Sequence, residues 1–410
     1  MQLIQNRKLI LGYALVMLLL IIYLPMMSAE TQSVKKKSIE YGWNAPTPDY
    51  FAKHFKEMEQ HPFDGVMMKL NAGKEVFKKT AYPIAAFTQD RKDLAATKSL
   101  HLTDNFVVMW SGMDDGWDWF NNSDWSSAEQ NVRNFAKTSR VGRLRGIAFD
   151  SEAYTNSPWN YTKQPERQHK TFREYQKQVR KRGAQFMKAL QTEQPGVQVL
   201  TFGLLSWLKD LWLAPPTDDA KLQQQLAEDR YGLWPAFVNG MLDAAQPSSV
   251  IIDGHEWAYY FYHAAAFDKT RDNIFKDARM FVDPVNYRKY ERQVKLGQAV
   301  YSDLLLDNFP NDTRDPRYGK TMPHFLSPDD RLRLLEHNLY HSLRTADRYA
   351  WIYSESADWW KNKIPKGAEA AILRAKKKIQ KEQSLGFNIE PAINKAIKKC
   401  RDINKQCQST

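Results

Sequence analysis

The strongest constraint on the fold is a repeated alternation of apolar and amphipathic segments. Short apolar runs span residues 39–44, 65–70, 106–110, 146–150, 197–203, 250–256, 299–304 and 349–355. Amphipathic stretches lie between them at 49–60, 129–139, 171–191, 233–245 and 328–345. Strands that alternate with helices form a parallel sheet, and eight such strands close into a barrel. We therefore predict a (β/α)8 TIM barrel over residues 38–360.

The N-terminal segment, residues 1–29, has a different character. Arg7 and Lys8 precede an apolar run at 9–27, and Ser28-Ala29 follows it. This order is typical of a secretory signal peptide, here cleaved after Ala29. The run is also nearly long enough to cross a bilayer, which leaves an uncleaved membrane anchor as the alternative. Both interpretations predict a periplasmic or secreted protein.

The C-terminal extension, residues 361–410, carries most of the excess positive charge. It contributes +9 to the net charge of +12, and Arg7 and Lys8 contribute a further +2, so the body of the chain is nearly neutral. We therefore expect no nucleic-acid partner. Two helical segments are predicted, at 368–383 and 391–401. They either pack on the barrel with a solvated basic face, or contact an anionic polymer or phospholipid headgroups.

The chain offers no pattern for a bound cofactor. Its two cysteines, Cys400 and Cys407, have no zinc-type spacing, and whether they are bridged stays open. There is no glycine-rich phosphate loop. We expect neither a metal site nor an organic cofactor.

The most informative local motif is the run from Gly146 to Tyr154, in which an apolar segment ends in two acids. Side chains alternate along a strand, so Asp150 and Glu152 point to the same side. In a parallel barrel that side is the axis, at the C-terminal mouth where these barrels keep their active sites. Burying two acids there for stability alone is costly. We interpret Asp150 and Glu152 as catalytic.

The ends of the other predicted strands carry large aromatic rings beside amides and charged groups. Sugar rings stack their C–H faces on aromatic rings and give their hydroxyls to polar groups, so this composition predicts carbohydrate binding. The candidate substrate-binding residues are Trp43, Asn44, Lys69, Trp110, Tyr154, Asp253, His255, Trp257, Tyr353 and Trp359.

Cleavage of a glycosidic bond needs a proton donor and a second catalytic group. We predict Glu152 as the acid, because the charge of Asp150 two residues earlier should raise its pKa. Glu256 and Glu355 each end a predicted strand and are candidates for the second carboxylate. For Glu355, an ion pair with Lys69 or a neighbouring Arg is an equally good interpretation.

The motif around Asp150 resembles the fourth-strand signature D-x-x-D-x-D-x-E of the chitinase-like glycoside hydrolases. In that family the final Glu is the general acid and the preceding Asp orients the substrate. Here Asp150, Glu152 and the following Tyr154 match, while Arg145 and Ala148 stand at the two earlier acidic positions. More broadly, 41–44 and 351–355 are similar to secreted bacterial TIM-barrel glycoside hydrolases. The resemblance implies a barrel that acts on sugars.

These observations lead to a secreted glycoside hydrolase acting on a polysaccharide or oligosaccharide. The alternative is a non-catalytic polysaccharide-binding protein on a decayed hydrolase barrel. A lyase would need a Tyr or His base beside a charge neutraliser such as Lys69. An esterase is disfavoured because the chain contains no G-x-S-x-G motif.

Overall fold

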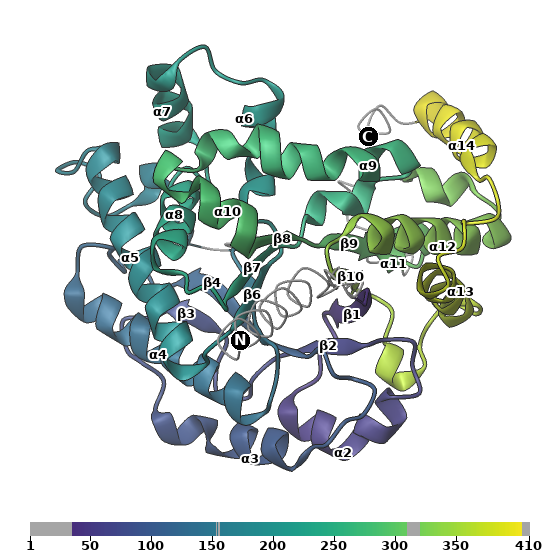
Figure 1. Ribbon diagram of the computed structural model, residues 1–410, viewed down its shortest axis with the longest axis horizontal. Helices are drawn as coiled ribbons and strands as arrows, with labels where there is room; N and C mark the ends of the chain where they lie inside the picture. The colour runs from purple at the N-terminus through teal and green to yellow at the C-terminus, as the bar shows by residue number, and fades with distance from the viewer. Residues whose placement is uncertain (1–34, 153, 155, 310–319, 404–410) are drawn as a thin grey trace, which may run out of the picture. The chain divides into compact units, whose positions relative to one another are not determined.

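The alternating pattern folds into a ring of parallel strands with helices around it (Figure 1). The structure is a computed structural model, and it describes residues 35–403 except 153, 155 and 310–319. The strands are β1 (Lys37–Gly42), β2 (Gly65–Met68), β3 (Glu75–Phe77), β4 (Phe106–Met113), β5 (Gly146–Asp150), β6 (Gln198–Thr201), β7 (Val250–Asp253), β8 (Val294–Leu296), β9 (Gln298–Tyr301) and β10 (Tyr349–Ser354). The pairing order is β8-β7-β6-β5-β4-β2-β1-β10-β9, with β3 added beside β4. This is the predicted (β/α)8 TIM barrel.

The seventh barrel strand differs from its predicted position. It consists of two short pieces, β8 on β7 and β9 on β10, on either side of Gly297, whose N–H donates to the Asp253 carbonyl at 2.7 Å. The predicted strand at 299–304 is wrong at its end, because Ser302–Leu306 form helix α11. Asp303 explains the change. Its buried carboxylate accepts backbone N–H groups of Glu355 and Ser356, and so braces the turn after β10.

Helices cover the outside of the ring. The longer ones are α2 (Pro48–Met58), α3 (Thr88–Ala96), α4 (Asn122–Val141), α5 (Phe172–Glu193), α7 (Asp219–Glu228), α8 (Trp234–Ala244), α9 (Ala264–Asp272) and α12 (Pro328–Thr345), with the shorter α6 (Lys209–Leu213) and α10 (Tyr287–Gln293). Two of them start with clear capping signals. The Ser327 hydroxyl accepts the Asp330 N–H before α12, and Thr171 and Glu174 form a reciprocal capping box at α5.

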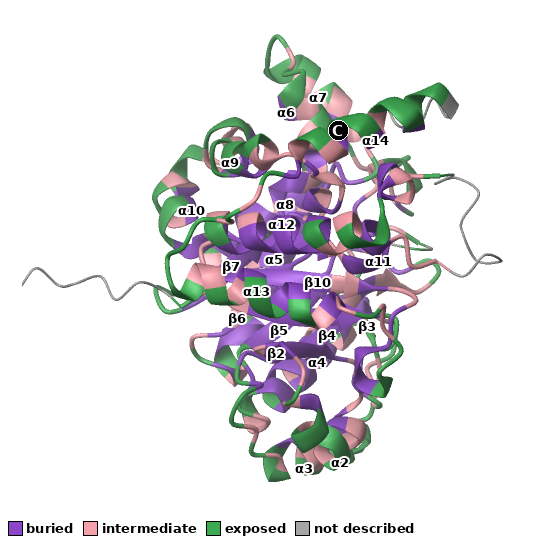
Figure 2. Ribbon diagram, turned by 90° about the vertical axis from the view of Figure 1, so that its right-hand side faces the viewer, coloured by how far each residue is buried: buried purple, intermediate pink, exposed green. Residues whose placement is uncertain are grey.

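Two apolar layers hold the barrel together. The inner layer fills the axis and includes Ile39, Val108, Ala148, Leu200 and Trp351. The outer layer lies between the strands and the helices. Figure 2 shows this buried material on the strands and on the inward faces of the helices. Because successive side chains alternate between the two layers, the register of β5 sends Ala148 and Asp150 to the axis.

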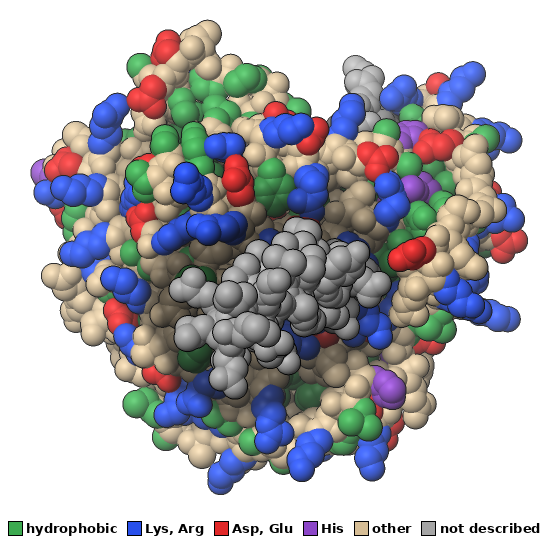
Figure 3. Space-filling view, viewed as in Figure 1, with side chains coloured by type: hydrophobic (Ala, Val, Ile, Leu, Met, Phe, Trp, Pro, Cys, Tyr) green, Lys and Arg blue, Asp and Glu red, His purple; other side chains and the backbone are tan. Residues whose placement is uncertain are grey.

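The basic extension packs on the barrel. Helices α13 (Ala368–Gln380) and α14 (Glu390–Ile403) occur close to the predicted segments, and α13 lies against α12. Part of the positive charge is neutralised there, since Lys376 pairs with Asp64 at 2.7 Å and Lys378 with Glu336 at 2.6 Å. Cys400 is disulfide-bonded, while Cys407 lies outside the described residues. Figure 3 shows Lys and Arg side chains spread over one face, with acidic groups among them.

The predicted signal segment, residues 1–29, lies outside the described residues. Among the helices that the structure does describe, none is both long and apolar enough to cross a membrane.

A buried acid outside the barrel axis makes folding stability depend on pH. Glu40 lies on β1 and is 2% exposed, and burial together with the charge of Asp358 raises its pKa to about 8. In the unfolded chain this carboxyl ionises near pH 4.5. Between these two values the folded protein keeps a proton that the unfolded chain releases. The contribution of Glu40 to stability therefore falls as the pH rises from about 4.5 to 8.

We expect the Glu40→Gln variant to lose this dependence. Relative to the wild type, its free energy of unfolding should rise by on the order of 3 kcal/mol at pH 8, with little change at pH 4.5. Urea denaturation at the two pH values measures the difference, with the exposed Glu57→Gln on α2 as control. An equal effect of Glu40→Gln at both pH values would contradict the assignment.

Candidate active site

The mouth of the barrel is organised by Asp150, the last residue of β5. Its side chain is completely buried, and the Trp110 side chain, opposite it on β4, hydrogen-bonds to it. Burial raises the pKa of Asp150 to about 8, with a smaller upward contribution from the charge of Glu152. Asp150 therefore carries a proton at neutral pH.

Asp150 also shapes the segment that carries the second acid. Its Oδ1 accepts the Glu152 N–H at 2.9 Å, and its Oδ2 accepts the Tyr154 hydroxyl at 3.4 Å. The Tyr154 hydroxyl also hydrogen-bonds to the Glu152 carboxyl. One buried aspartate thus turns the chain so that Glu152 follows it into the mouth.

The pKa of Glu152 is raised, as predicted, but for a different reason. The main cause is burial of the partly accessible side chain, opposed by the hydrogen bond from Tyr154 and the charge of Arg230. The repulsion from Asp150 on which the prediction relied is not among the causes. Desolvation, rather than a neighbouring negative charge, therefore makes Glu152 a weaker acid than a free glutamate.

Glu256 joins the two acids from another strand. β7 ends at Asp253, and Glu256 begins the 3-10 turn η4 (Glu256–Tyr260) after His255, whose φ of 48° is left-handed. The Glu256 N–H donates to the Phe202 carbonyl at 2.9 Å, which ties the turn to the end of β6. Burial, then the charges of Glu152 and Asp150, raise the pKa of Glu256 well above its usual range. Asp150, Glu152 and Glu256 therefore form one electrostatic cluster, here named the acid cluster.

Glu355 is held differently. Its Oε1 accepts the Tyr353 hydroxyl at 3.2 Å, and the Tyr301 hydroxyl also hydrogen-bonds to it. Lys69, its suggested ion-pair partner, donates instead to the Trp43 carbonyl at 2.6 Å. In the part of the chain that the structure describes, Glu355 is thus bound by tyrosine hydroxyls rather than by a cation.

Trp43 stands at the rim beside this group. It is 69% exposed, yet its Nε1 donates to the Tyr353 hydroxyl at 2.7 Å. An exposed ring held in one orientation is suited to stacking against a ligand, because little side-chain freedom is lost on binding. Asn44 next to it is also exposed, and its Nδ2 reaches the Ala357 carbonyl at 3.5 Å.

Several predicted substrate-binding residues have structural contacts instead. Asp253 is buried and accepts the hydroxyl and N–H of Ser206 at 2.6 and 3.1 Å. His255 is buried against Gln298 at 3.0 Å, and burial lowers its pKa, so the ring is neutral. Trp359 is completely buried and donates to Ser354. These three side chains support the mouth without lining it.

The tryptophans near the strand ends mostly fill the core. Of the thirteen, all described, only Trp43 is exposed, while Trp110, Trp207 and Trp257 are partly accessible. A group of four packs with Phe77 in the outer layer: Trp117, Trp119, Trp125 and Trp159. The expected aromatic rim is therefore smaller than the sequence indicates.

Tyrosines that the prediction did not include fill much of the mouth. Tyr41 and Tyr301 point inward from β1 and β9, and Tyr259 stacks on Tyr353 with ring centroids 5.4 Å apart. Charges of Asp150 and Glu256 contribute to the raised pKa of Tyr41. Tyr41 and Tyr301 could have been predicted from the alternation of side chains along a strand. Each comes two residues after an inward-facing residue, Ile39 or Ala299.

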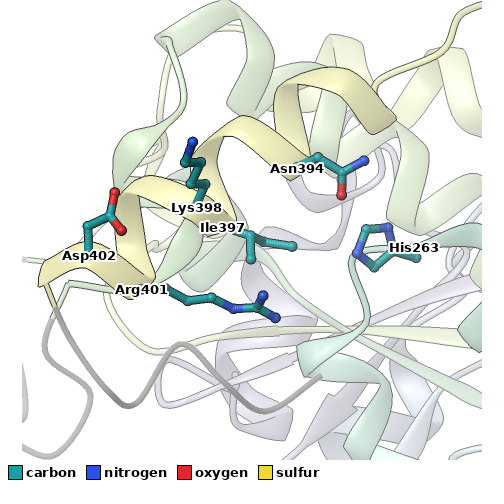
Figure 4. A pocket seen from close by; sticks show the side chains of 6 residues that line it. All are labelled: His263, Asn394, Ile397, Lys398, Arg401 and Asp402. Carbon is teal, nitrogen blue, oxygen red and sulfur yellow. The ribbon is translucent and has the colours of Figure 1, made fainter.

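Two further features concern the described residues as a whole. No group of three or more His, Cys, Asp or Glu side chains there could hold a metal ion. A cavity of about 410 Å³ lies beside α14, where Asn394, Ile397 and Arg401 extend toward the segment carrying His263 (Figure 4). No member of the acid cluster lines this cavity.

Comparisons with known proteins concern the fold. No family model and no curated protein matches the chain. Solved structures do, among them a broad-specificity GH5-4 endoglucanase from an uncultured bacterium, at 10% identity over 82% of this chain and 85% of that one, with a TM-score of 0.44. A glycoside hydrolase family 5 enzyme from Prevotella bryantii is 8% identical over 84% and 96%, with a TM-score of 0.42. A GH18 chitinase from Pseudoalteromonas aurantia is 10% identical over 83% and 100%, with a TM-score of 0.34. At these values the similarity assigns neither an activity nor a residue role to this chain.

Proposed function

We propose that this protein is a secreted glycoside hydrolase that cleaves a polysaccharide or oligosaccharide at the C-terminal mouth of its barrel. The observation that carries the proposal is the acid cluster, in which three carboxyls beyond the ends of β5 and β7 have raised pKa values and interact electrostatically. A site that must give a proton at neutral pH while another carboxyl stays ionised needs such neighbours.

In this proposal Glu152 is the general acid. Burial raises its pKa while its side chain stays partly accessible, so it can protonate a glycosidic oxygen and recover a proton from solvent. Asp150 is a positioning residue, since it holds the Glu152 N–H and the Tyr154 hydroxyl.

Glu256 is the preferred second carboxylate. The charges of Glu152 and Asp150 both contribute to its raised pKa, so protons on those two groups lower the cost of ionising it. Burial is the larger cause of that raised pKa, so Glu256 has to lose a proton before it can act as a base or a nucleophile. Glu355, bound by Tyr301 and Tyr353, is assigned to substrate positioning.

The test is release of reducing ends from a panel of bacterial and algal polysaccharides by the purified protein. Release from at least one polymer supports the proposal. If no polymer is cleaved but one retards the protein in an affinity gel, the barrel is a polysaccharide-binding protein and the proposal fails.

Export is part of the proposal and rests on the segment 1–29. Fractionation of cells that express the chain, with mass spectrometry of its N-terminus, checks both compartment and cleavage after Ala29. Recovery in the cytoplasm would contradict it.

A further inference from the structure

A second group of side chains lies near Glu152 and does not belong to the acid cluster. It consists of Trp207, Arg230 and Tyr231. Trp207 lies in the turn η3 (Leu205–Leu208), just after β6. Its ring rests on Gly203, where an added Cβ would stand 2.2 Å from the ring atoms Cδ1 and Nε1. The Gly203 carbonyl accepts the hydroxyl of Ser151, the residue between Asp150 and Glu152, at 3.3 Å. Trp207 is thus placed next to the acid cluster.

A tight turn between α7 and α8 brings Tyr231 onto this ring. The Tyr231 N–H donates to the Asp229 carboxylate at 2.6 Å. At Gly232 an added Cβ would stand 1.6 Å from the Leu226 carbonyl oxygen, so only glycine lets the turn approach α7 this closely. The rings of Trp207 and Tyr231 stack with centroids 4.8 Å apart.

Both stacked rings carry a polar atom without a partner. The Trp207 Nε1 and the Tyr231 hydroxyl are buried and have no hydrogen bond within the described part of the chain. Tyr231 as a whole is only 5% exposed. Buried donors are rarely left unpaired in folded proteins, because the lost hydration is not replaced. Burial, followed by the charge of Glu152, raises the pKa of Tyr231, so these two side chains interact electrostatically.

Arg230 adds a positive charge at the same place. Its guanidinium carbon lies 4.9 Å from the centroid of the Tyr231 ring, and its charge lowers the pKa of Glu152. The side chain is exposed, and no carboxylate pairs with it among the described residues. Two buried donors and a free guanidinium all favour an acceptor with negative charge.

We propose that Trp207, Arg230 and Tyr231 form a subsite for the carboxylate of an acidic sugar, so that the substrate contains a uronic acid residue next to the bond that Glu152 protonates. This inference rests on the proposed function. A carboxylate can accept hydrogen bonds from all three side chains and pair with the guanidinium, whereas a neutral sugar hydroxyl lacks the negative charge that Arg230 complements. A carboxylate bound there also keeps Glu152 protonated, since a neighbouring negative charge opposes its ionisation.

The experiment measures binding separately from cleavage. Glu152→Gln protein is titrated with a uronic acid tetrasaccharide and with the same compound after reduction of its carboxyls to alcohols, and calorimetry gives both dissociation constants. We expect the acidic compound to bind at least about tenfold more tightly. Adding Arg230→Gln or Tyr231→Phe should reduce this preference to about threefold or less. Trp207→Phe keeps an aromatic ring and removes the N–H donor. It should also lower the preference for the acidic tetrasaccharide.

Arg288→Gln is the matched control, because Arg288 is exposed on α10 and is not part of the subsite. It should leave the preference unchanged, which separates the subsite from the overall positive charge. Equal binding of the two tetrasaccharides, or a preference that survives all three substitutions, overturns the inference. If the protein binds the acidic tetrasaccharide more tightly but the wild type cleaves no polysaccharide, the proposed hydrolase activity fails and the carboxylate subsite stands. If the wild type cleaves neutral polymers and the two tetrasaccharides bind equally, the carboxylate subsite fails and the hydrolase activity stands.

Discussion

Glu152→Gln should lower kcat for polysaccharide cleavage by at least about 100-fold, which corresponds to roughly 2.7 kcal/mol of transition-state stabilisation. The amide has the shape of the acid and can keep its contact with Tyr154, but it has no proton to give to the leaving oxygen. Substrate affinity should change little, because the side chain acts in the transition state. Initial rates of reducing-end release and a binding titration measure the two effects.

The dependence on the leaving group makes this prediction specific. An aryl glycoside with an acidic phenol needs little protonation, so the loss in Glu152→Gln should shrink to about tenfold or less on that substrate. Glu57→Gln on α2, exposed and outside the mouth, is the control and should retain full activity. If Glu152→Gln cleaves both substrates at wild-type rates, Glu152 is not the acid.

Glu256→Gln should lower kcat by a comparable factor, about 100-fold or more, whereas Glu355→Gln should cost about tenfold or less. Glu256 interacts electrostatically with Glu152. Glu355 instead accepts hydrogen bonds from the hydroxyls of Tyr301 and Tyr353. Removing Glu256 leaves the acid without its second carboxylate. Removing Glu355 changes only how the tyrosines are held.

Small anions distinguish the two roles open to Glu256. Glu256→Ala leaves room for an anion. Azide that restores the rate of this variant and yields a glycosyl azide of inverted configuration would identify a nucleophile, because the anion takes the place of the carboxylate. A rate that stays low with azide would indicate a base that activates water. If Glu355→Gln lowers kcat more than Glu256→Gln does, Glu355 rather than Glu256 is the second catalytic carboxylate.

Much of the barrel could be predicted from periodicity alone. Five of the eight barrel strands lie within the predicted apolar runs, and β1 and β4 extend two and three residues beyond theirs. A strand covered on both faces needs apolar residues on both, which is why the runs mark it. The exception is the predicted strand at 299–304. Asp303 interrupts the run, and only the folded chain reveals that its carboxylate binds the backbone after β10.

The acid cluster was predictable in part. Alternation along β5 placed Asp150 at the axis, and this is confirmed by its register with Ala148. The sequence could not show that Glu152 owes its raised pKa to burial, because desolvation depends on neighbours far along the chain. It also could not separate Trp43 at the rim from Trp159 or Trp359 in the core, since an indole ring is compatible with both environments.

The sequence by itself determined the barrel, the strand that ends at Asp150 just before Glu152, and the position of the basic extension, because each depends on local spacing and composition. Only the tertiary structure decided which carboxyls interact electrostatically and which tyrosines hydrogen-bond to Glu355. It also decided that Trp207, Arg230 and Tyr231 lie beside Glu152. Those relations join side chains from different strands and loops, and their energies depend on distance and burial rather than on separation along the chain.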